Sequence, residues 1–361
     1  MSDSYFDNFD FDKAIQWHLD QVRKLRTSTG LFTASAHDVA TGYNKAWLRD
    51  IYFMTLGFKY AGEMDVVTST AKALLRVLSK HKEKISMAAG SKPFETWQYI
   101  HARYNPETFE EYWEEWGNKQ HDAVGEVLYL IADCENSGNS VVETDEEKEL
   151  VQLLVNYLHT IEYWHDPDSG IWEENQEVRA SSIGSVVCAL KSASKLSYVS
   201  IPEGMIEKGE QALRALLPRE TDTRFCDLAL LTLIFPFEVT TEEETKKILE
   251  NVEYFLTRDQ GVVRYRNDRY YNNNKHDGYS EEAEWSMGLA WLAIIYAKLG
   301  NIEKMKEYLK RCEDTVNKDG LIPELWYSHT TQSNDNTPLG WAESMYVVAL
   351  VLGKELLRKN S

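Results

Sequence analysis

The sequence predicts an all-α fold in which paired helices close into a ring. Apolar residues recur at helical spacing through most of the 361 residues. Short and long connections alternate between the expected helices, which favours helical hairpins standing side by side. No sequence motif repeats along the chain, so a closed toroid is favoured over an open solenoid. We expect a single domain over residues 1–361, because no linker or low-complexity tract divides the chain.

Several of the expected helices have clear start or stop signals. Thr144 and Thr241 are each followed by acidic residues, which is typical of a capped first turn. Gly300 is expected to end one helix, and Asn301 to begin the next. About twelve helices follow from the periodicity, over residues 10–26, 47–62, 65–83, 121–134, 145–163, 180–195, 205–216, 224–234, 241–256, 281–299, 302–316 and 340–358.

Long loops rich in aromatic residues precede every second helix, at 27–46, 84–120, 164–179, 257–280 and 317–339. In a ring of hairpins these loops would all gather at one end. Each carries Trp or Tyr together with an acid or an arginine, so we expect a polar cleft with aromatic walls at that end. The clusters are AWLRD (46–50), WGNKQHD (116–122), GIWEEN (170–175), RYRNDRYY (264–271) with EAEW (282–285), and LIPELW (321–326).

A cleft of this kind suits a sugar, whose ring faces stack on aromatic side chains and whose hydroxyls bind charged groups. Hydrolysis of a glycosidic bond requires two carboxyl groups, one of which donates a proton. Glu173 is favoured as the donor, because Trp172 and Glu174 beside it would both raise its pKa. Glu324, on another rim loop after the stiffening Pro323, is the natural partner.

Each of these residues also has a structural alternative when taken alone. Glu173 and Glu174 fit ordinary acid at a helix start, and Arg49 with Asp50 fits an ion pair at a helix end. Glu324 alone is most often a solvated loop acid. The aromatic residues that fit either the core or the cleft are Trp47, Trp116, Trp285 and Trp341.

Composition and missing motifs exclude several other functions. A net charge of −19 disfavours nucleic acid and anionic membranes as partners. The acidic N-terminus has no signal-peptide pattern and no apolar run reaches membrane-spanning length, so a cytoplasmic protein is expected.

The four cysteines form no C-x-x-C, and His101, His121 and His329 have no spaced second ligand, so no metal or other cofactor is expected. Glu284, within EAEW, is expected to be a helix residue rather than a catalyst. The G-x-S-x-G, P-loop and G-x-G-x-x-G motifs do not occur.

An ordered set of short motifs resembles one enzyme family. The chain is similar to the glucoamylase-like glycoside hydrolases of family 15, and its pattern is nearest to the amino-terminal domain of phosphorylase kinase α and β subunits. The motifs occur in family order over roughly residues 28–352. They are AWLRD, HARYN (101–105), WGNKQHDA (116–123), GIWEEN with SSIG (181–184), LLPR (216–219), RYRNDRYY, AEW (283–285), IPELW (322–326) and PLGWAESMY (338–346).

This resemblance implies an (α/α)6 barrel of six helical hairpins, with its cleft at the end that bears the long loops. It also implies an inverting, exo-acting hydrolase that releases glucose from the non-reducing end of α-glucosides or α-glucans. Glu173 matches the general acid, and Glu324 matches the general base. The positions matched or expected to bind substrate are Arg49, Asp50, Glu174, Trp116, Arg264, Trp341, Trp47 and Tyr43.

The same resemblance allows a catalytically silent, glucan-binding regulatory domain. Leu325 follows the expected base where glucoamylases commonly have Gln, and Gly340–Ser344 is nearer to the kinase-subunit pattern. Both expected catalytic carboxylates are nevertheless present, as is the second acid, Glu174, which favours an active enzyme. A third possibility, a helical scaffold, predicts no saccharide binding.

Overall fold

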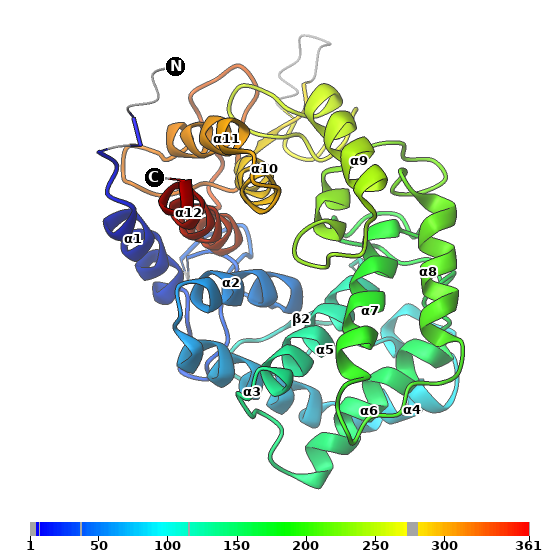
Figure 1. Cartoon of the computed structure of the whole chain (residues 1–361). Coiled ribbons are helices and arrows are strands. Elements are labelled where there is room, and N and C mark those ends of the chain that lie inside the picture. The colour runs from blue at the N-terminus through cyan, green and yellow to red at the C-terminus, as the bar shows by residue number, and fades with distance from the viewer. Residues whose placement is uncertain (1–4, 7, 37, 115, 273–280, 361) are drawn as a thin grey trace.

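Twelve α-helices surround a common centre in the computed structural model, which describes residues 5–6, 8–36, 38–114, 116–272 and 281–360 (Figure 1). The all-α class and the (α/α)6 barrel are confirmed. The helices are α1 (Phe11–Lys24), α2 (Leu48–Tyr60), α3 (Met64–Lys80), α4 (Lys82–Gly90), α5 (His121–Asn136), α6 (Asp145–Thr160), α7 (Ala180–Ala193), α8 (Met205–Leu216), α9 (Glu242–Phe255), α10 (Ser286–Lys298), α11 (Ile302–Asp314) and α12 (Gly340–Asn360).

The inner ring consists of α2, α5, α7, α10 and α12, with a short 3-10 helix, η2 (Leu228–Leu233), between α7 and α10. Each of these elements contacts the next, and α12 returns to contact α2, which closes the ring. Inner helices are surrounded by protein and are therefore apolar on nearly all sides. In α10, for example, every residue from Ser286 to Ala297 is buried.

The outer helices are amphipathic, because only one face of each packs on the inner ring. In α11 the buried residues Met305, Tyr308, Leu309 and Cys312 follow the spacing of a single helical face. The expected start signals are present. Thr144 and Thr241 form capping boxes at α6 and α9, and Asn301 caps α11.

Three expected elements are wrong. The predicted helix 224–234 is only the 3-10 helix η2, because Asp227 has an extended backbone and its side chain caps the segment by accepting from Ala229 N–H. The predicted loop 84–120 begins with α4, which extends to Gly90. Glu284 lies in a strand, not in a helix, and α10 begins two residues later. The last residues of the predicted loop 257–280, 273–280, lie outside the described residues.

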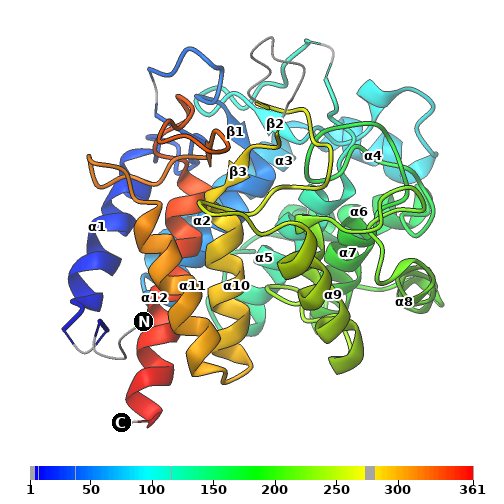
Figure 2. The same ribbon diagram turned by 90° about the horizontal axis from the view of Figure 1, so that it is seen from above.

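Two small antiparallel strand pairs join the loops at one end of the barrel. Strand β1 (Ala46–Trp47) pairs with β2 (Arg103–Tyr104), and β3 (Glu284–Trp285) pairs with β4 (Leu325–Trp326). Figure 2 shows these strands and the long loops above one end of the helices. Since β1 continues into α2 and β3 into α10, the pairing fixes the loop residues at the openings of two inner helices.

Within the described residues, no helix is both long enough and apolar enough to cross a bilayer.

Candidate functional site

A pocket of ≈ 470 Å³ lies at the loop-bearing end of the barrel. Residues from all five long loops contribute to its wall, which is the convergence that the alternating loop lengths predict. All ten residues singled out in the sequence line this pocket: Tyr43, Trp47, Arg49, Asp50, Trp116, Glu173, Glu174, Arg264, Glu324 and Trp341.

The segment that contains Glu173 is a tight turn and not a helix start, since α7 begins only at Ala180. Glu173 itself has a left-handed backbone, with φ of 60°, and Glu174 N–H donates to Ser169 O at 3.0 Å. A non-glycine residue in this conformation is strained by about 1 kcal/mol or more, so the surrounding structure must hold it there. Gly117 packs directly on this turn, because a Cβ there would approach Glu173 O to 2.9 Å.

The Glu173 carboxyl combines burial with nearby positive charge. Its side chain is 22% exposed, and Oε1 accepts a 3.0 Å hydrogen bond from Arg49 Nη2. Burial raises the pKa of Glu173, whereas the positive charges of Arg49 and Arg103 oppose the rise. Burial is the largest cause, as expected for a carboxyl group in apolar surroundings, but Glu174 is not among the main causes of the raised pKa of Glu173.

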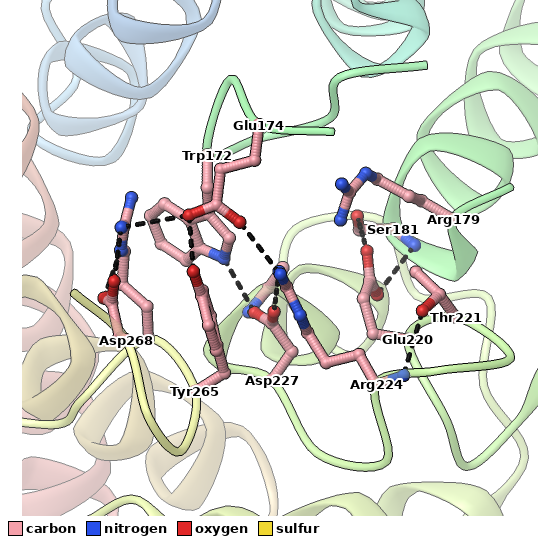
Figure 3. Close-up of polar contacts among 12 residues, drawn as sticks. Trp172, Glu174, Arg179, Ser181, Glu220, Thr221, Arg224, Asp227, Tyr265 and Asp268 are labelled. Carbon is pink, nitrogen blue, oxygen red and sulfur yellow. Dashed lines mark hydrogen bonds and ion pairs between the residues drawn. The ribbon is translucent and has the colours of Figure 1, made fainter. Parts of the chain in front are cut away.

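The Glu174 carboxylate forms ion pairs with two arginines, Arg224 and Arg264 (Figure 3). Its Oε1 accepts from Tyr265 Oη at 2.6 Å and from Arg264 Nη2 at 3.1 Å, and its Oε2 accepts from Arg224 Nη2 at 2.8 Å. This pairing offsets the negative charge of Glu174 next to Glu173. It also uses three of the four acceptor positions of the carboxylate.

The buried side chain of Asp227 contacts Trp172, the residue before Glu173 (Figure 3). Asp227 Oδ1 accepts from the indole N–H of Trp172 at 2.8 Å, and its Oδ2 accepts from Arg224 Nη1 at 3.0 Å. Beyond it, Glu220 accepts from Ser181 Oγ at 2.5 Å, and burial raises the pKa of Glu220 to about 8. These contacts connect the turn to the start of α7 and to η2.

Glu324 lies just before β4 and is 1% exposed. Its Oε1 accepts from Tyr43 Oη at 2.8 Å, and its Oε2 accepts from Asn336 Nδ2 at 2.7 Å and from Asn334 Nδ2. Burial raises the pKa of Glu324, whereas these three donors lower it because they favour the ionised form. One acceptor position, on Oε1, remains available to a further donor.

Arg49 and Asp50 do not form a mutual ion pair within the described residues. Arg49 Nη1 instead donates to Gln120 and to Asp122, each at 2.8 Å, and its Nη2 donates to Glu173. Asp50 lies in the first turn of α2, and no other described residue donates a hydrogen bond to its side chain. Burial raises the pKa of Asp50 to about 7, against the positive charge of Arg49.

Aromatic rings surround the charged groups. The guanidinium of Arg264 lies over Trp172, Trp285, Tyr265 and Tyr270, with Cζ 4.7–5.7 Å from the ring centroids. Trp341 stacks on Phe53 with centroids 4.4 Å apart. The buried indole nitrogens of Trp285 and Trp341 have no hydrogen-bond partner within the described residues, so a ligand hydroxyl could accept from them.

Some residues of this site were not recognised in the sequence. Four residues within the motifs HARYN and RYRNDRYY also line the pocket: Arg103, Tyr265, Asp268 and Tyr270. Arg224 and Asp227 fall within the predicted helix 224–234, so the sequence does not indicate their contacts with Glu174 and Trp172. The loop amides Asn334 and Asn336 had no local sequence signal.

No group of three His, Cys, Asp or Glu side chains in the described part of the chain could hold a metal ion. His121 is instead buried against Asp166, with Nε2 and Oδ2 2.9 Å apart.

Known proteins of two kinds resemble this chain. One is the probable phosphorylase b kinase regulatory subunit alpha of Caenorhabditis elegans. It is 28% identical over 289 residues, which cover 66% of this chain and 23% of that protein. The skeletal muscle isoform from Oryctolagus cuniculus is 26% identical over 402 residues, which cover 91% of this chain and 31% of that protein. This chain thus spans less than a third of the length of these relatives.

Solved structures share the fold at low sequence identity. A wild-type glycosidase superposes with a TM-score of 0.80, at 19% identity and over 96% of both chains. The sequence profile described as Glycosyl hydrolases family 15 matches residues 17–204, which is more than half of the chain. The pocket therefore lies in a glycosidase-type barrel, and the chain belongs to glycosyl hydrolase family 15.

Proposed function

We propose that this protein is an inverting, exo-acting glycoside hydrolase that releases glucose from the non-reducing end of α-glucosides or α-glucans. The observation that carries the proposal is that two carboxyl groups from separate loops, Glu173 and Glu324, line one pocket of a family 15 barrel. We also propose that residues 1–361 act as one domain, supported by the closure of α12 on α2.

Glu173 would protonate the glycosidic oxygen. Burial raises its pKa, which favours the protonated state that a general acid needs near neutral pH. The hydrogen bond from Arg49 Nη2 would then stabilise the carboxylate that forms when the proton leaves. The strained turn holds the side chain in the pocket, which limits its freedom before the reaction.

Glu324 would receive the proton of the attacking water. Its three side-chain donors favour the ionised form, which is the form that a base requires. The remaining acceptor position on Oε1 is suited to a water molecule. A displacement by water on the face opposite the leaving group inverts the anomeric carbon.

Asp50, Arg264 and the unpaired indoles would hold the terminal glucose. Asp50 has acceptor positions that no described side chain occupies, and a buried carboxylate binds hydroxyl donors strongly. The indole N–H groups of Trp285 and Trp341 would donate to sugar oxygens. Glu174 would keep Arg264 in position, with at most one acceptor position for the substrate.

A comparison of two variants tests this proposal. Incubation with maltose, isomaltose, kojibiose and trehalose should release glucose from at least one disaccharide. Glu173→Gln and Glu324→Gln should each lower kcat by about 10²–10⁴-fold, because each removes one proton transfer. No glucose from any of the four disaccharides or from an α-glucan such as glycogen, or full activity in both variants, would refute the proposal.

A second candidate is a glucan-binding regulatory domain without turnover. It is favoured by the named relatives, which are regulatory subunits of phosphorylase b kinase and far longer than this chain. This candidate predicts saccharide binding by calorimetry and no glucose release with any of the disaccharides. The presence of both carboxylates in the pocket favours the enzyme.

A further inference from the structure

A buried acid on α12 contacts the loop that carries Glu324. Glu343 lies in the first turn of α12 and is fully buried. Its Oε1 accepts from the backbone N–H of Ile322 at 2.8 Å, two residues before Glu324. No other described residue accepts from this amide, and Ile322 is itself buried. The position of the Glu324 loop therefore depends on a side chain to which the proposed reaction gives no role.

The other oxygen of Glu343 faces α1, which packs beside α12 (Figure 1). His18 Nδ1 on α1 lies 2.5 Å from Glu343 Oε2, and the His18 ring packs edge-on against Tyr346. Burial raises the pKa of Glu343, whereas His18 and the Ile322 N–H oppose the rise because they favour the ionised form. A contact that only joined α1 to α12 would require one oxygen of Glu343. The second bond, to Ile322, indicates a further role.

The chain between Ile322 and Glu324 is stiff. Pro323 fixes its own φ and restricts the backbone of Ile322 before it. Three backbone hydrogen bonds also hold this segment: Ile322 O accepts from Leu339 N at 3.0 Å, Glu324 N donates to Asn336 O at 3.1 Å, and Glu324 O accepts from Ser286 N at 3.3 Å. Since backbone groups make these three bonds, the contact with Glu343 is the one of the four that depends on a side chain. A shift of Ile322 would reach Glu324 across a single stiff residue.

We propose that Glu343 is a positioning residue, which sets the place of the general base Glu324 through the backbone of Ile322. The inference rests on the proposed function, since Glu324 is the base of that reaction. Glu343 is not among the residues that line the pocket, so it acts only through the loop. A base must lie within hydrogen-bond reach of the water that it activates, and a displacement of about 1 Å can lower a rate about 10²-fold. Loss of the Glu343 contact should therefore lower kcat while the glucose-binding residues stay in place.

Three variants separate this role from a purely structural one. Glu343→Leu removes both the acceptor of the Ile322 N–H and the partner of His18. His18→Phe breaks the same contact with α1, but it leaves the Glu343 oxygen that faces Ile322 and a ring against Tyr346. Glu343→Gln keeps an acceptor oxygen for Ile322. With the best of the tested glucosides, kcat should fall about 10–100-fold in Glu343→Leu at an unchanged KM and stay within about twofold of wild type in the other two. Urea denaturation should show a loss of stability in both Glu343→Leu and His18→Phe, so stability alone does not account for the difference in kcat.

Azide identifies a misplaced base. Azide ion attacks the anomeric carbon of α-glucosyl fluoride without help from a base: the C–N bond forms as the C–F bond breaks, and fluoride leaves with the bonding electrons. Azide should therefore raise the rate of fluoride release by Glu343→Leu and leave the rates of the wild type and His18→Phe nearly unchanged. Equal losses of kcat in Glu343→Leu and His18→Phe would overturn the positioning role, as would a Glu343→Leu rate that azide does not raise.

Hydrogen–deuterium exchange, measured by mass spectrometry, separates this inference from the proposed function because it needs no turnover. Peptides over residues 318–326 should exchange faster in Glu343→Leu than in the wild type, and at the wild-type rate in His18→Phe. If no protein releases glucose but this pattern holds, Glu343 positions the Glu324 loop and the hydrolase proposal fails. If Glu343→Leu exchanges and turns over like the wild type, the positioning proposal is overturned and the hydrolase proposal stands. If Glu343→Leu does not fold, Glu343→Asp takes its place, because the shorter side chain cannot reach both partners, and the same outcomes decide.

Discussion

The indole N–H of Trp172 donates a 2.8 Å hydrogen bond to Asp227, which lies 55 residues further along the chain. Asp227 also accepts from Arg224, and Arg224 donates to Glu174 (Figure 3). One buried carboxylate therefore fixes the residues on both sides of Glu173. Because Glu173 has a strained backbone, we expect its position to depend on this anchor.

Removal of the anchor should affect both stability and turnover. Asp227→Ala leaves Arg224 and the Trp172 indole without a buried partner, so the free energy of unfolding should fall by about 3 kcal/mol. Urea denaturation measures this change, and kcat should fall with little change in KM. Trp172→Phe removes the N–H and the pyrrole ring but leaves Asp227 paired with Arg224, so it should produce a smaller loss of both. A wild-type kcat in folded Asp227→Ala would contradict the anchoring role.

The Tyr43 hydroxyl should control the acidic limb of the pH profile. It donates to Glu324 at 2.8 Å and so stabilises the ionised base. Tyr43→Phe should raise the pKa of Glu324, and the acidic limb of kcat/KM should then move to higher pH, because activity requires the deprotonated base. The alkaline limb, assigned to Glu173, should not move.

Tyr270→Phe is the control for this experiment, because Tyr270 contacts the Tyr43 hydroxyl at 2.9 Å but not Glu324. Its acidic limb should stay near that of the wild type. If the acidic limb of kcat/KM lies at the same pH in Tyr43→Phe and in the wild type, the assignment of Glu324 as the base is contradicted.

Asp50 should destabilise the native state at alkaline pH. Its pKa of about 7 in the folded protein exceeds the ordinary value of about 4, so the native state binds the proton more tightly than the unfolded chain. The contribution of Asp50 to stability therefore falls as the pH rises from about 4 to about 7.

Asp50→Asn removes this ionisation. Above pH 7 the variant should be about 2–4 kcal/mol more stable than the wild type, and near pH 4 the two should be similar. Thermal unfolding at both pH values measures the difference, with Asp319→Asn as the control at an exposed aspartate. The same variant should have a lower kcat/KM, because the buried group at position 50 that accepts from sugar hydroxyls is then an uncharged amide. Equal stability of variant and wild type at pH 8 would refute the burial argument.

The two carboxyl groups should differ in their response to a better leaving group. Fluoride leaves α-glucosyl fluoride without protonation, so Glu173→Gln should hydrolyse this substrate far better than a disaccharide. Glu324→Gln should remain inactive on both, because the attacking water still lacks its base. Initial rates of fluoride release measure the contrast, and the opposite pattern would exchange the two roles.

The sequence predicts much of this fold because loop lengths and helix periodicity reflect the ring directly. The capped starts at Thr144 and Thr241 are local signals, and the structure contains them as expected. The η2 segment was not predicted, because its apolar sequence LALLTL fits a buried helix equally well.

The sequence predicts which loops meet at the pocket, but not the contacts that form behind it. Residues within aromatic motifs, such as Arg49 and Glu173, could be assigned to one rim from the order of the loops. The sequence gives no sign that Asp227 contacts Trp172, because that contact depends on tertiary packing. The contribution expected from Glu174 to the pKa of Glu173 is not among its main causes, and the pairing of Glu174 with Arg224 and Arg264 forms only in the folded chain.

The stereochemistry of the released glucose tests the central proposal most directly. Proton NMR spectra recorded within the first minutes of hydrolysis distinguish α- from β-glucose before the anomers equilibrate. Hydrolysis of an α-glucoside by Glu173 and Glu324 acting through water should release β-glucose first. Initial release of α-glucose, or no release of glucose from any α-glucoside or α-glucan, would contradict the proposal.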